Sequence, residues 1–207
     1  MKLKWLTLVV LFLASPALSY WQSRLQVATG CVATNAPTGG IYDNATLSGW
    51  ALSNATLSTN QLIAPDCTET ASTVVEDITT NTHAAYVQVT HTFTAAAFTF
   101  SGYLQRGVGT RNAWPEVSNS TVSSTLYVYI SLDSCTVISG PTTTGAAFTL
   151  TSATATLQSN GWCKFTLGGT ITDTSVFLAA NLLSGTSTKS YTGDGSSSVS
   201  YWGIDLR

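Results

Sequence analysis

Beyond the first twenty positions, apolar residues recur at every second position, in short runs that end at Gly, Asn, Ser or Asp. Such alternation is typical of β-strands with one buried face. The runs predict strands over 50–53, 71–75, 85–93, 97–105, 125–132, 146–150, 153–158, 162–168, 176–183 and 199–206, with loops over 106–122 and 184–198. Because no strand–helix–strand unit interrupts them, we expect an all-β, antiparallel β-sandwich of the jelly-roll type.

The alternation also assigns a face to each side chain. On 97–105, one face carries Phe98, Phe100, Gly102 and Leu104, and the other carries Thr99, Ser101, Tyr103 and Gln105. On 125–132, Tyr127 and Tyr129 are expected to point outward. Trp202 is expected to share a core face with Ile204 and Leu206. Outward tyrosines among hydroxyls and amides are either ordinary strand surface or a platform for sugar rings, and both interpretations stay open.

The N-terminal segment has the layout of a secretory signal peptide. Lys2 and Lys4 precede an apolar run over 5–14, and small and turn-forming residues follow. We expect a signal peptide over 1–19, an extension over 20–40 and one sandwich domain over 41–207. Retention of the segment as an anchor and lipid attachment at Cys31 are the alternatives. We therefore expect a secreted, extracellular or virion-surface protein with no membrane contact after cleavage.

Four cysteines accompany this export signal. Cys135 and Cys163 lie near the ends of neighbouring predicted strands and are expected to form one disulfide. Cys31 and Cys67 would then form the second, closing the N-terminal region. A zinc site is disfavoured because no Cys-x-x-Cys occurs and neither histidine has ligand spacing to a cysteine.

Charge is scarce in this chain. Charged residues make up 9%, and the formal net charge is −2. Binding to nucleic acid requires clustered Lys and Arg that neutralise phosphates, and the chain has no such cluster. An anionic membrane surface is disfavoured for the same reason.

A set of short motifs resembles a known kind of domain. The motifs are Ser48-Gly49-Trp50, Ala64-Pro65-Asp66, Val75-Glu76-Asp77, His83, residues 98–103, Asn160-Gly161-Trp162, residues 191–195 and residues 201–206. Their order is similar to that in the jelly-roll, carbohydrate-binding-module-like domains of phage tail fibres, tailspikes and related surface proteins. The resemblance implies a sandwich that attaches to a polysaccharide or other glycan, or that supports other parts near a glycan surface. The chain departs from the pattern at Cys67 and at Cys163-Lys164.

The outward tyrosines give the expected ligand surface. Tyr103, Tyr127 and Tyr129 form its centre, and Trp114, Arg106 and Arg111 lie at its edge, in the predicted loop over 106–122. A loop tryptophan beside Arg and Asn is a suitable anchor for a sugar or a partner. The equal alternative is that Trp114 folds back and closes the end of the sandwich.

Catalysis is not expected. Glu76 and Asp77 are adjacent, so on a strand they point to opposite faces and make a poor acid–base pair. No G-x-S-x-G motif accompanies the histidines. A structural calcium at Asp194 and Asp205 is a weaker expectation, against the alternative that Asp194 only forms a tight turn. The hypotheses are therefore a non-catalytic glycan-binding module, a virion assembly protein that forms a homo-oligomer through the same face, and, third, a polysaccharide-degrading enzyme.

Overall fold

The computed structural model describes Cys31 and residues 38–207, so the predicted signal peptide and most of the predicted extension lie outside the described residues. The strands are β1 (Tyr42–Asn44), β2 (Ala51–Ser53), β3 (Ala55–Leu62), β4 (Ala71–Glu76), β5 (Thr80–Asn81), β6 (Ala84–Arg106), β7 (Asn112–Asn119), β8 (Thr125–Ser131), β9 (Thr136–Thr144), β10 (Phe148–Leu157), β11 (Cys163–Leu183), β12 (Tyr191–Thr192) and β13 (Ser198–Leu206). Every pairing between them is antiparallel. The predicted all-β antiparallel sandwich is confirmed. No helix within these residues is long and apolar enough to cross a membrane.

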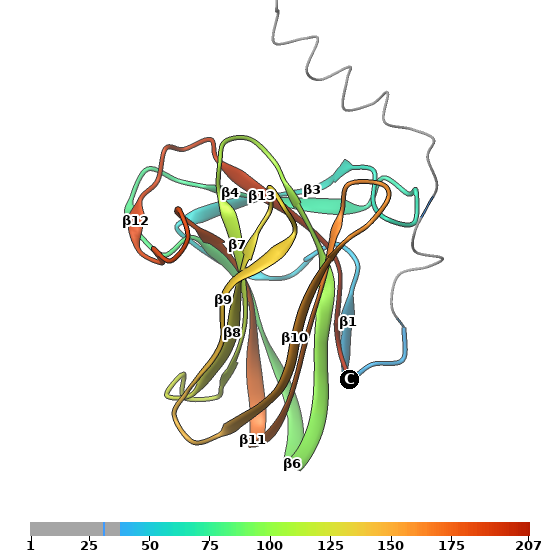
Figure 1. Ribbon diagram of the computed structural model, residues 1–207, viewed down its shortest axis with the longest axis vertical. Coiled ribbons are helices and arrows are strands. Elements are labelled where there is room, and N and C mark those ends of the chain that lie inside the picture. Colours follow the sequence, from blue (N-terminus) through green and yellow to red (C-terminus); the bar gives the residue numbers. More distant parts are fainter. Residues whose placement is uncertain (1–30, 32–37) are drawn as a thin grey trace, which may run out of the picture. The chain divides into compact units, whose positions relative to one another are not determined.

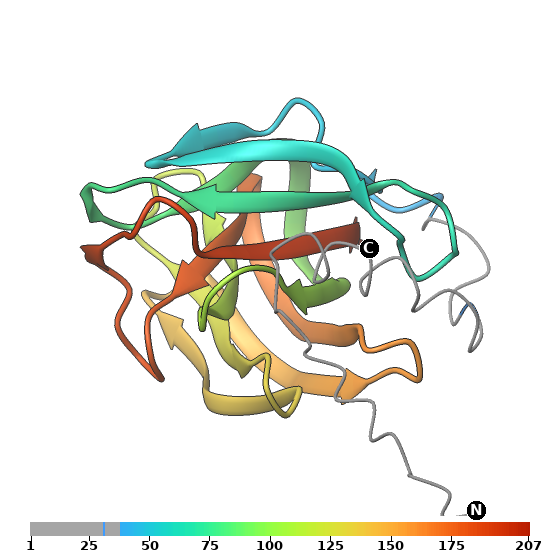
Figure 2. The ribbon, with the colours of Figure 1, turned by 90° about the horizontal axis from the view of Figure 1, so that it is seen from above.

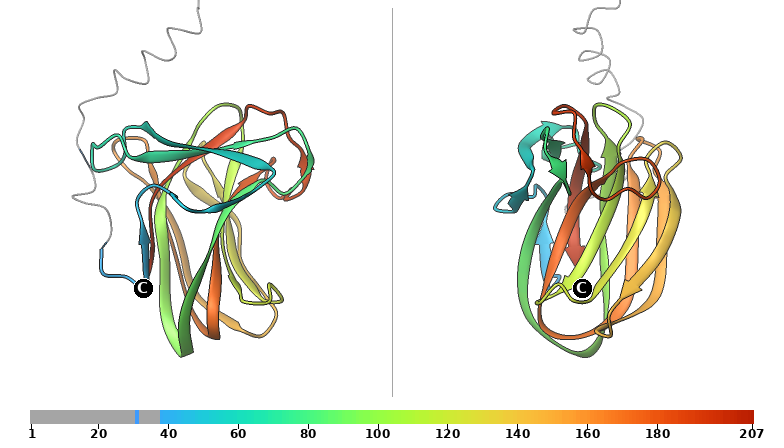
Figure 3. Two further views of the ribbon diagram at one scale, coloured as in Figure 1. Left: turned by 180° about the vertical axis from the view of Figure 1, so that it is seen from behind. Right: turned by 90° about the vertical axis from the view of Figure 1, so that its left-hand side faces the viewer.

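Two long strands belong to both layers of the sandwich. The first half of β6 pairs with the second half of β11, and the second half of β6 pairs with the first half of β11. The first layer continues from β6 to β13 and β4 and from β11 to β10; the second continues from β11 to β7, β8 and β9. Figure 1 shows β6 and β11 running together to the lower end of the domain, and Figure 3 shows the layers from behind and from the side.

Both long strands bend where their ladder is irregular. Ala95 of β6 has a φ of 50°, and the register with β11 shifts on both sides of Asp173. Such bulges add an unpaired residue and sharpen the local bend. The Asp173 carboxylate accepts hydrogen bonds from the Ser120 hydroxyl and the Thr174 N–H, which fixes the bent segment. The runs predicted as 85–93 and 97–105 are therefore one strand.

The core lies between the layers. Phe100 of β6 and Phe165 of β11 contact edge to face, with centroids 5.2 Å apart. Gly102 leaves the space they need, because a Cβ there would lie 2.6 Å from Ile204 Cδ1 and 2.8 Å from Phe165 Cε1. Burial of this central pair joins the second half of β6 to the first half of β11. Figure 2 shows β3, β4 and β13 side by side in the first layer.

Several predictions about strands are wrong. The stretch 184–198 contains β12, and β3 and β9 were not predicted. The stretch 106–122 contains β7, whose residues are all buried, so apolar and polar residues do not alternate along this strand. Trp202 does not share a face with Ile204 and Leu206. The register with β6 shifts between Trp202 and Asp205 at Gly203, which has a φ of 62°. Trp202 therefore packs with Trp162 in a small second cluster, while Ile204 and Leu206 lie in the main core.

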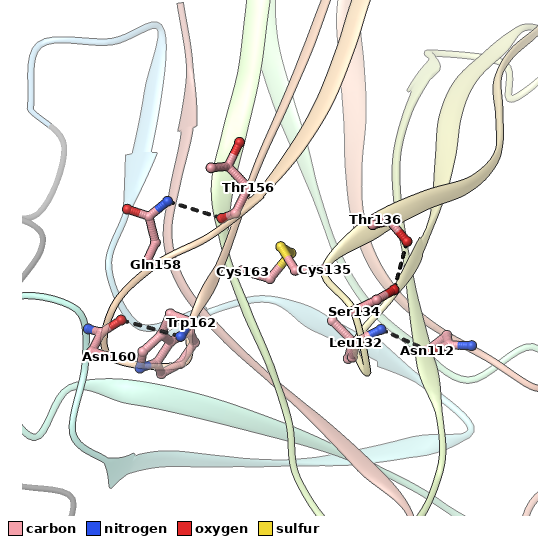
Figure 4. Close-up of a disulfide and its surroundings, with 10 residues drawn as sticks. All are labelled: Asn112, Leu132, Ser134, Cys135, Thr136, Thr156, Gln158, Asn160, Trp162 and Cys163. Atoms are coloured by element: carbon pink, nitrogen blue, oxygen red, sulfur yellow. Dashed lines mark hydrogen bonds between the residues drawn. A yellow bond between two sulfur atoms is a disulfide. The ribbon is translucent and has the colours of Figure 1, made fainter.

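Both predicted disulfides are present. Cys135 and Cys163 join the turn after β8 to the start of β11, and Cys31 joins Cys67. Figure 4 shows the Cys135–Cys163 bond beside the hydrogen-bonded turn at Ser134. Its cysteines are buried, whereas Cys31 and Cys67 are exposed. Two disulfides fit an extracellular protein.

The buried bond is expected to contribute more to stability than the exposed one. The closed loops are similar, with separations of 28 and 36 residues, so loop closure alone predicts about 4 kcal/mol for each. The double variant Cys135→Ala/Cys163→Ala also leaves a cavity, which adds to the loss. Chemical denaturation should therefore rank it below Cys31→Ala/Cys67→Ala. The reverse order would show that packing around the buried sulfurs adds nothing.

Candidate functional site

The six residues of the predicted ligand surface do not form one surface. Tyr103 lies on the outer face of the first layer, paired in register with Lys164 and Trp202. Tyr127 and Tyr129 lie on β8, in the second layer. Each strand turns the predicted face outward, since Leu104 and Val128 lie in the core. The outer faces of the two layers point in opposite directions, so Tyr103 lies on the other side of the sandwich from Tyr127 and Tyr129.

An aromatic cluster on the second layer is formed by Trp114, Tyr127, Tyr129 and Lys189. Trp114 lies in strand β7, so its prediction as a loop residue is wrong. The Lys189 ammonium lies 3.5 Å from the Tyr127 ring centroid, 3.9 Å from that of Trp114 and 5.7 Å from that of Tyr129. These are cation–π distances. Trp114 and Tyr129 are only 6% and 8% exposed, so the chain's own lysine occupies the space where a ligand would stack.

Glu116 lies beside this cluster, two residues after Trp114. The side chain is buried, and its burial raises the pKa of the carboxyl group, while the charge of Lys189 acts to lower it. Because burial wins, ionisation of Glu116 disfavours the folded state. The aromatic cluster is therefore packed internally, and the neighbouring Glu116 carboxyl group destabilises the folded protein when it is charged.

The two arginines expected at the ligand edge are engaged in ion pairs. Arg106 pairs with Asp133 and donates a hydrogen bond to Asn112. Arg111 forms a two-pronged pair with Glu76, at 2.6 and 2.8 Å, and Glu76 is fully buried. Burial of Glu76 acts to raise its pKa, but hydrogen bonds from Arg111, the Asp194 N–H and other donors leave the pKa lowered. Both arginines stabilise the end of the sandwich.

The predicted calcium ligands each have protein partners. The Asp194 carboxylate accepts hydrogen bonds from the hydroxyls and the N–H groups of Ser196 and Ser197, which lower its pKa. Asp205 pairs with Arg207 at 2.6 Å. Cys31 and residues 38–207 contain no group of three or more His, Cys, Asp or Glu side chains placed to hold a metal ion. Asp194 thus closes a tight turn with Ser196 and Ser197.

An open groove of about 440 Å³ lies on the outer face of the first layer. The outer groove is lined by Thr99, Ser101 and Tyr103 of β6, Lys164 and Thr166 of β11, Gly203 and Asp205 of β13, and Arg207. Register places them in rows: Ser101 lies between Thr166 and Asp205, and Tyr103 lies opposite Lys164. Burial raises the pKa of Tyr103, so its hydroxyl stays a neutral donor.

One atom of the outer groove stands out chemically. Asp205 is 5% exposed, and its Oδ1 has no hydrogen-bond donor among the described residues. Its Oδ2 is held by Arg207, which also donates to the Thr38 carbonyl oxygen. An unpaired buried acceptor costs about 1–3 kcal/mol. Oδ1 is closed off from solvent and lies against Gly40, so this acceptor is buried beneath the groove and not on its surface.

Sequence reasoning found Tyr103 and Asp205 but assigned them to separate roles. It did not select Ser101, Thr166 or Lys164, because their place depends on the pairing of β6 with β11 and β13. The alternation along each strand could have shown that these side chains point outward. Their proximity could not be predicted, because it depends on the order of the strands in the sheet.

No protein-family model matches the chain. No curated protein matches it either. Among solved structures, it is similar to the enzymatically active domain of tailspike protein 4 of bacteriophage CBA120, at 10% identity and a TM-score of 0.46, over 84% of this chain and 21% of that chain. It is also similar to the CBM22-1 xylan-binding domain of Xyn10C from Paenibacillus barcinonensis, at 13% identity and a TM-score of 0.45, over 83% of this chain and 97% of that chain. The chain thus spans about a fifth of the tailspike domain.

The Arg111–Glu76 pair predicts a pH dependence of stability. The folded pKa of Glu76 lies below its unfolded value, so its contribution is present above the unfolded pKa and is lost as the pH falls through the folded pKa. Removing one partner of a buried pair costs about 3 kcal/mol. Glu76→Gln should therefore unfold more easily at pH 7, and the difference from wild type should narrow below a pH of about 4.

Denaturation of both proteins across this pH range checks this expectation. Asp133→Asn, which removes the exposed partner of Arg106, is the control and should change stability by less than about 1 kcal/mol. Equal losses in the two variants would contradict the structural role of the Arg111–Glu76 pair.

Glu116 predicts the opposite dependence of stability on pH. Its folded pKa is raised, so its favourable contribution is present below the unfolded pKa and is lost as the pH rises through the folded pKa. Glu116→Gln should therefore be more stable than wild type at pH 7 and equally stable near a pH of about 4. Thermal unfolding at the two pH values measures this. A variant less stable than wild type at pH 7 would mean that the charge of Lys189 stabilises ionised Glu116 by more than burial destabilises it.

Proposed function

We propose that this chain is a glycan-binding module and that the outer groove holds the ligand. The carrying observation is a groove lined by hydroxyl groups with the fixed ring of Tyr103 at one end. Sugars present both hydroxyl groups and C–H surfaces, and a groove of this kind suits both. The hydroxyls of Ser101 and Thr166 supply further bonds on either side of the strand pairing.

Tyr103 supports a sugar ligand over other polar molecules. It is half-buried against Trp202, with ring centroids 5.5 Å apart, so the position of its ring is fixed. A fixed aromatic ring beside hydroxyl groups suits a sugar, which has both C–H and O–H surfaces. This combination occurs at the Tyr103 end of the groove.

The polar surface extends past the groove. Thr154 and Thr156 of β10 pair with Thr166 and Lys164, and both threonines are exposed. The row through Ser101 therefore continues over four strands. A surface of this extent suits several consecutive sugar units of a polysaccharide. We propose binding without turnover, by a protein that is secreted or displayed on a cell or virion surface.

Substitutions on the two faces test the location of the ligand. Tyr103→Ala and Thr166→Ala should each weaken binding to a polysaccharide about tenfold, which is about 1.4 kcal/mol. Tyr127→Ala, on the other layer, is the matched control and should bind as wild type. Affinity electrophoresis against a panel of neutral and acidic polysaccharides measures the change, and thermal unfolding confirms that each variant folds.

Three outcomes would overturn the proposal. Wild type that binds no polysaccharide of the panel would exclude glycan binding. Weakened binding in Tyr127→Ala but not in Tyr103→Ala would move the ligand to the aromatic cluster. Accumulation of reducing ends during incubation would show that the chain cleaves its ligand.

A further inference from the structure

Lys164 lines the outer groove and has no carboxylate partner among the described residues. The described part of the chain holds five Lys and Arg side chains, and the other four are engaged: Arg106 with Asp133, Arg111 with Glu76, Arg207 with Asp205, and Lys189 with the aromatic cluster. Lys164 is exposed, and its ammonium lies 5.8 Å from the Tyr103 ring centroid. Its charge is therefore available to a ligand at the Tyr103 end of the groove.

The negative charge among the residues that line the groove lies beneath its surface. Asp205 is the carboxylate of this lining, and its Oδ1 is closed to solvent. Its Oδ2 is paired with Arg207, whose side chain is 51% exposed. The lining therefore holds two exposed cations, and its carboxylate is buried and compensated. A ligand on the groove meets positive charge.

The two cations lie toward opposite ends of the polar floor. Lys164 is opposite Tyr103 in the register, and the backbone of Arg207 exchanges hydrogen bonds of 2.7 and 2.9 Å with that of Thr99. Tyr103 and Thr99 share a face of β6 and are four residues apart, which is about 13 Å along the strand. Neither end of the groove thus presents an uncompensated carboxylate to a ligand.

The positive charge of the groove is a local feature of an acidic chain. The formal net charge of the chain is −2, so the protein as a whole does not attract polyanions. Asp43 is exposed on β1, beyond β13, and three strand spacings, about 14 Å, separate it from Lys164 across the sheet. Salt screens charges over about 8 Å at physiological ionic strength, so Asp43 does not cancel the charge of Lys164.

We propose that the ligand of the outer groove is an acidic polysaccharide, and that its carboxylate or sulfate group binds the Lys164 ammonium. This inference rests on the proposed function and names the ligand class of the same groove. An ammonium binds an anionic oxygen through a charge-assisted hydrogen bond, which is stronger than a bond between neutral groups. The Tyr103 ring contacts the C–H surface of the charged sugar unit. The hydroxyls of Ser101 and Thr166 bind the adjoining unit.

Pairs of polymers that differ only in charge test the proposal with the full chain. The carboxylate pair is polygalacturonate and its carboxyl-reduced form, and the sulfate pair is dextran sulfate and dextran. We expect wild type to bind the charged member of at least one pair about tenfold more tightly than the neutral member. Raising the salt concentration should weaken the binding of the charged member only. Polyglutamate, an anionic polymer without sugar rings, should bind at least about tenfold more weakly than the preferred polysaccharide.

Variants connect the preference to Lys164. Lys164→Gln should bind the charged and neutral members of a pair equally, whereas Lys164→Arg should keep the preference. Lys189→Gln removes a lysine from the other layer, so it is the matched control and should bind as wild type. Affinity electrophoresis or calorimetry gives the ratios, and thermal unfolding confirms that each variant folds.

The outcomes separate this inference from the proposed function. A preference in one pair supports the proposal and identifies the anionic group as carboxylate or sulfate. Equal binding within both pairs, or binding confined to neutral members, overturns the acidic ligand and leaves the glycan-binding module standing. Polyglutamate that binds as tightly as the polysaccharides overturns it as well, because charge alone would then explain the binding. Absence of binding to every polysaccharide overturns both proposals.

Discussion

The ladder between β6 and β11 is the constraint on which the rest of this structure depends. Its two halves belong to different layers, so a single antiparallel pairing defines the sandwich and its bend. Phe100 and Phe165 seal the ladder from inside, and Gly102 provides the room they need. Every other strand of the large sheet joins one half of this ladder directly or through one or two intervening strands. The floor of the outer groove is the outer face of the same ladder, so the groove rests on the best-supported part of the fold.

The two outer faces of the sandwich differ because different segments cover them. Lys189, from the segment between β11 and β12, places its ammonium over Tyr127 and Trp114 and hides the aromatic cluster. On the first layer, the segment between β3 and β4 covers Trp202 and Trp162, through hydrogen bonds to Thr70 and the Ile63 carbonyl oxygen. That cover ends at Tyr103. The groove opens where the covered cluster stops, which gives it one aromatic wall and a polar floor.

The alternation of apolar and polar residues predicted which face of its strand each side chain occupies. It did not predict which strands lie next to each other. The outward positions of Tyr103 and Tyr127 follow from period two along each strand, and both are as expected. Their separation follows from strand order, which brings together residues as distant as Ser101 and Asp205. Alternation also fails where a strand is buried on both faces, as in β7, and where a bulge reverses the phase, as at Gly203. The disulfide pairs were predictable because four cysteines allow few pairings and strand ends limit them.

Asp205 shows how the end of the chain closes the edge of the outer groove. Gly40 packs so closely that a Cβ there would lie 2.5 Å from Asp205 Oδ1, which fixes the carboxylate against its neighbour. Arg207 fixes the carboxylate from the other side through Oδ2. A buried acceptor without a donor disfavours folding by about 1–3 kcal/mol. Because Oδ1 is closed to solvent, Asp205 supports the edge of the groove, and the hydroxyl groups and Tyr103 are the groups that a ligand can contact.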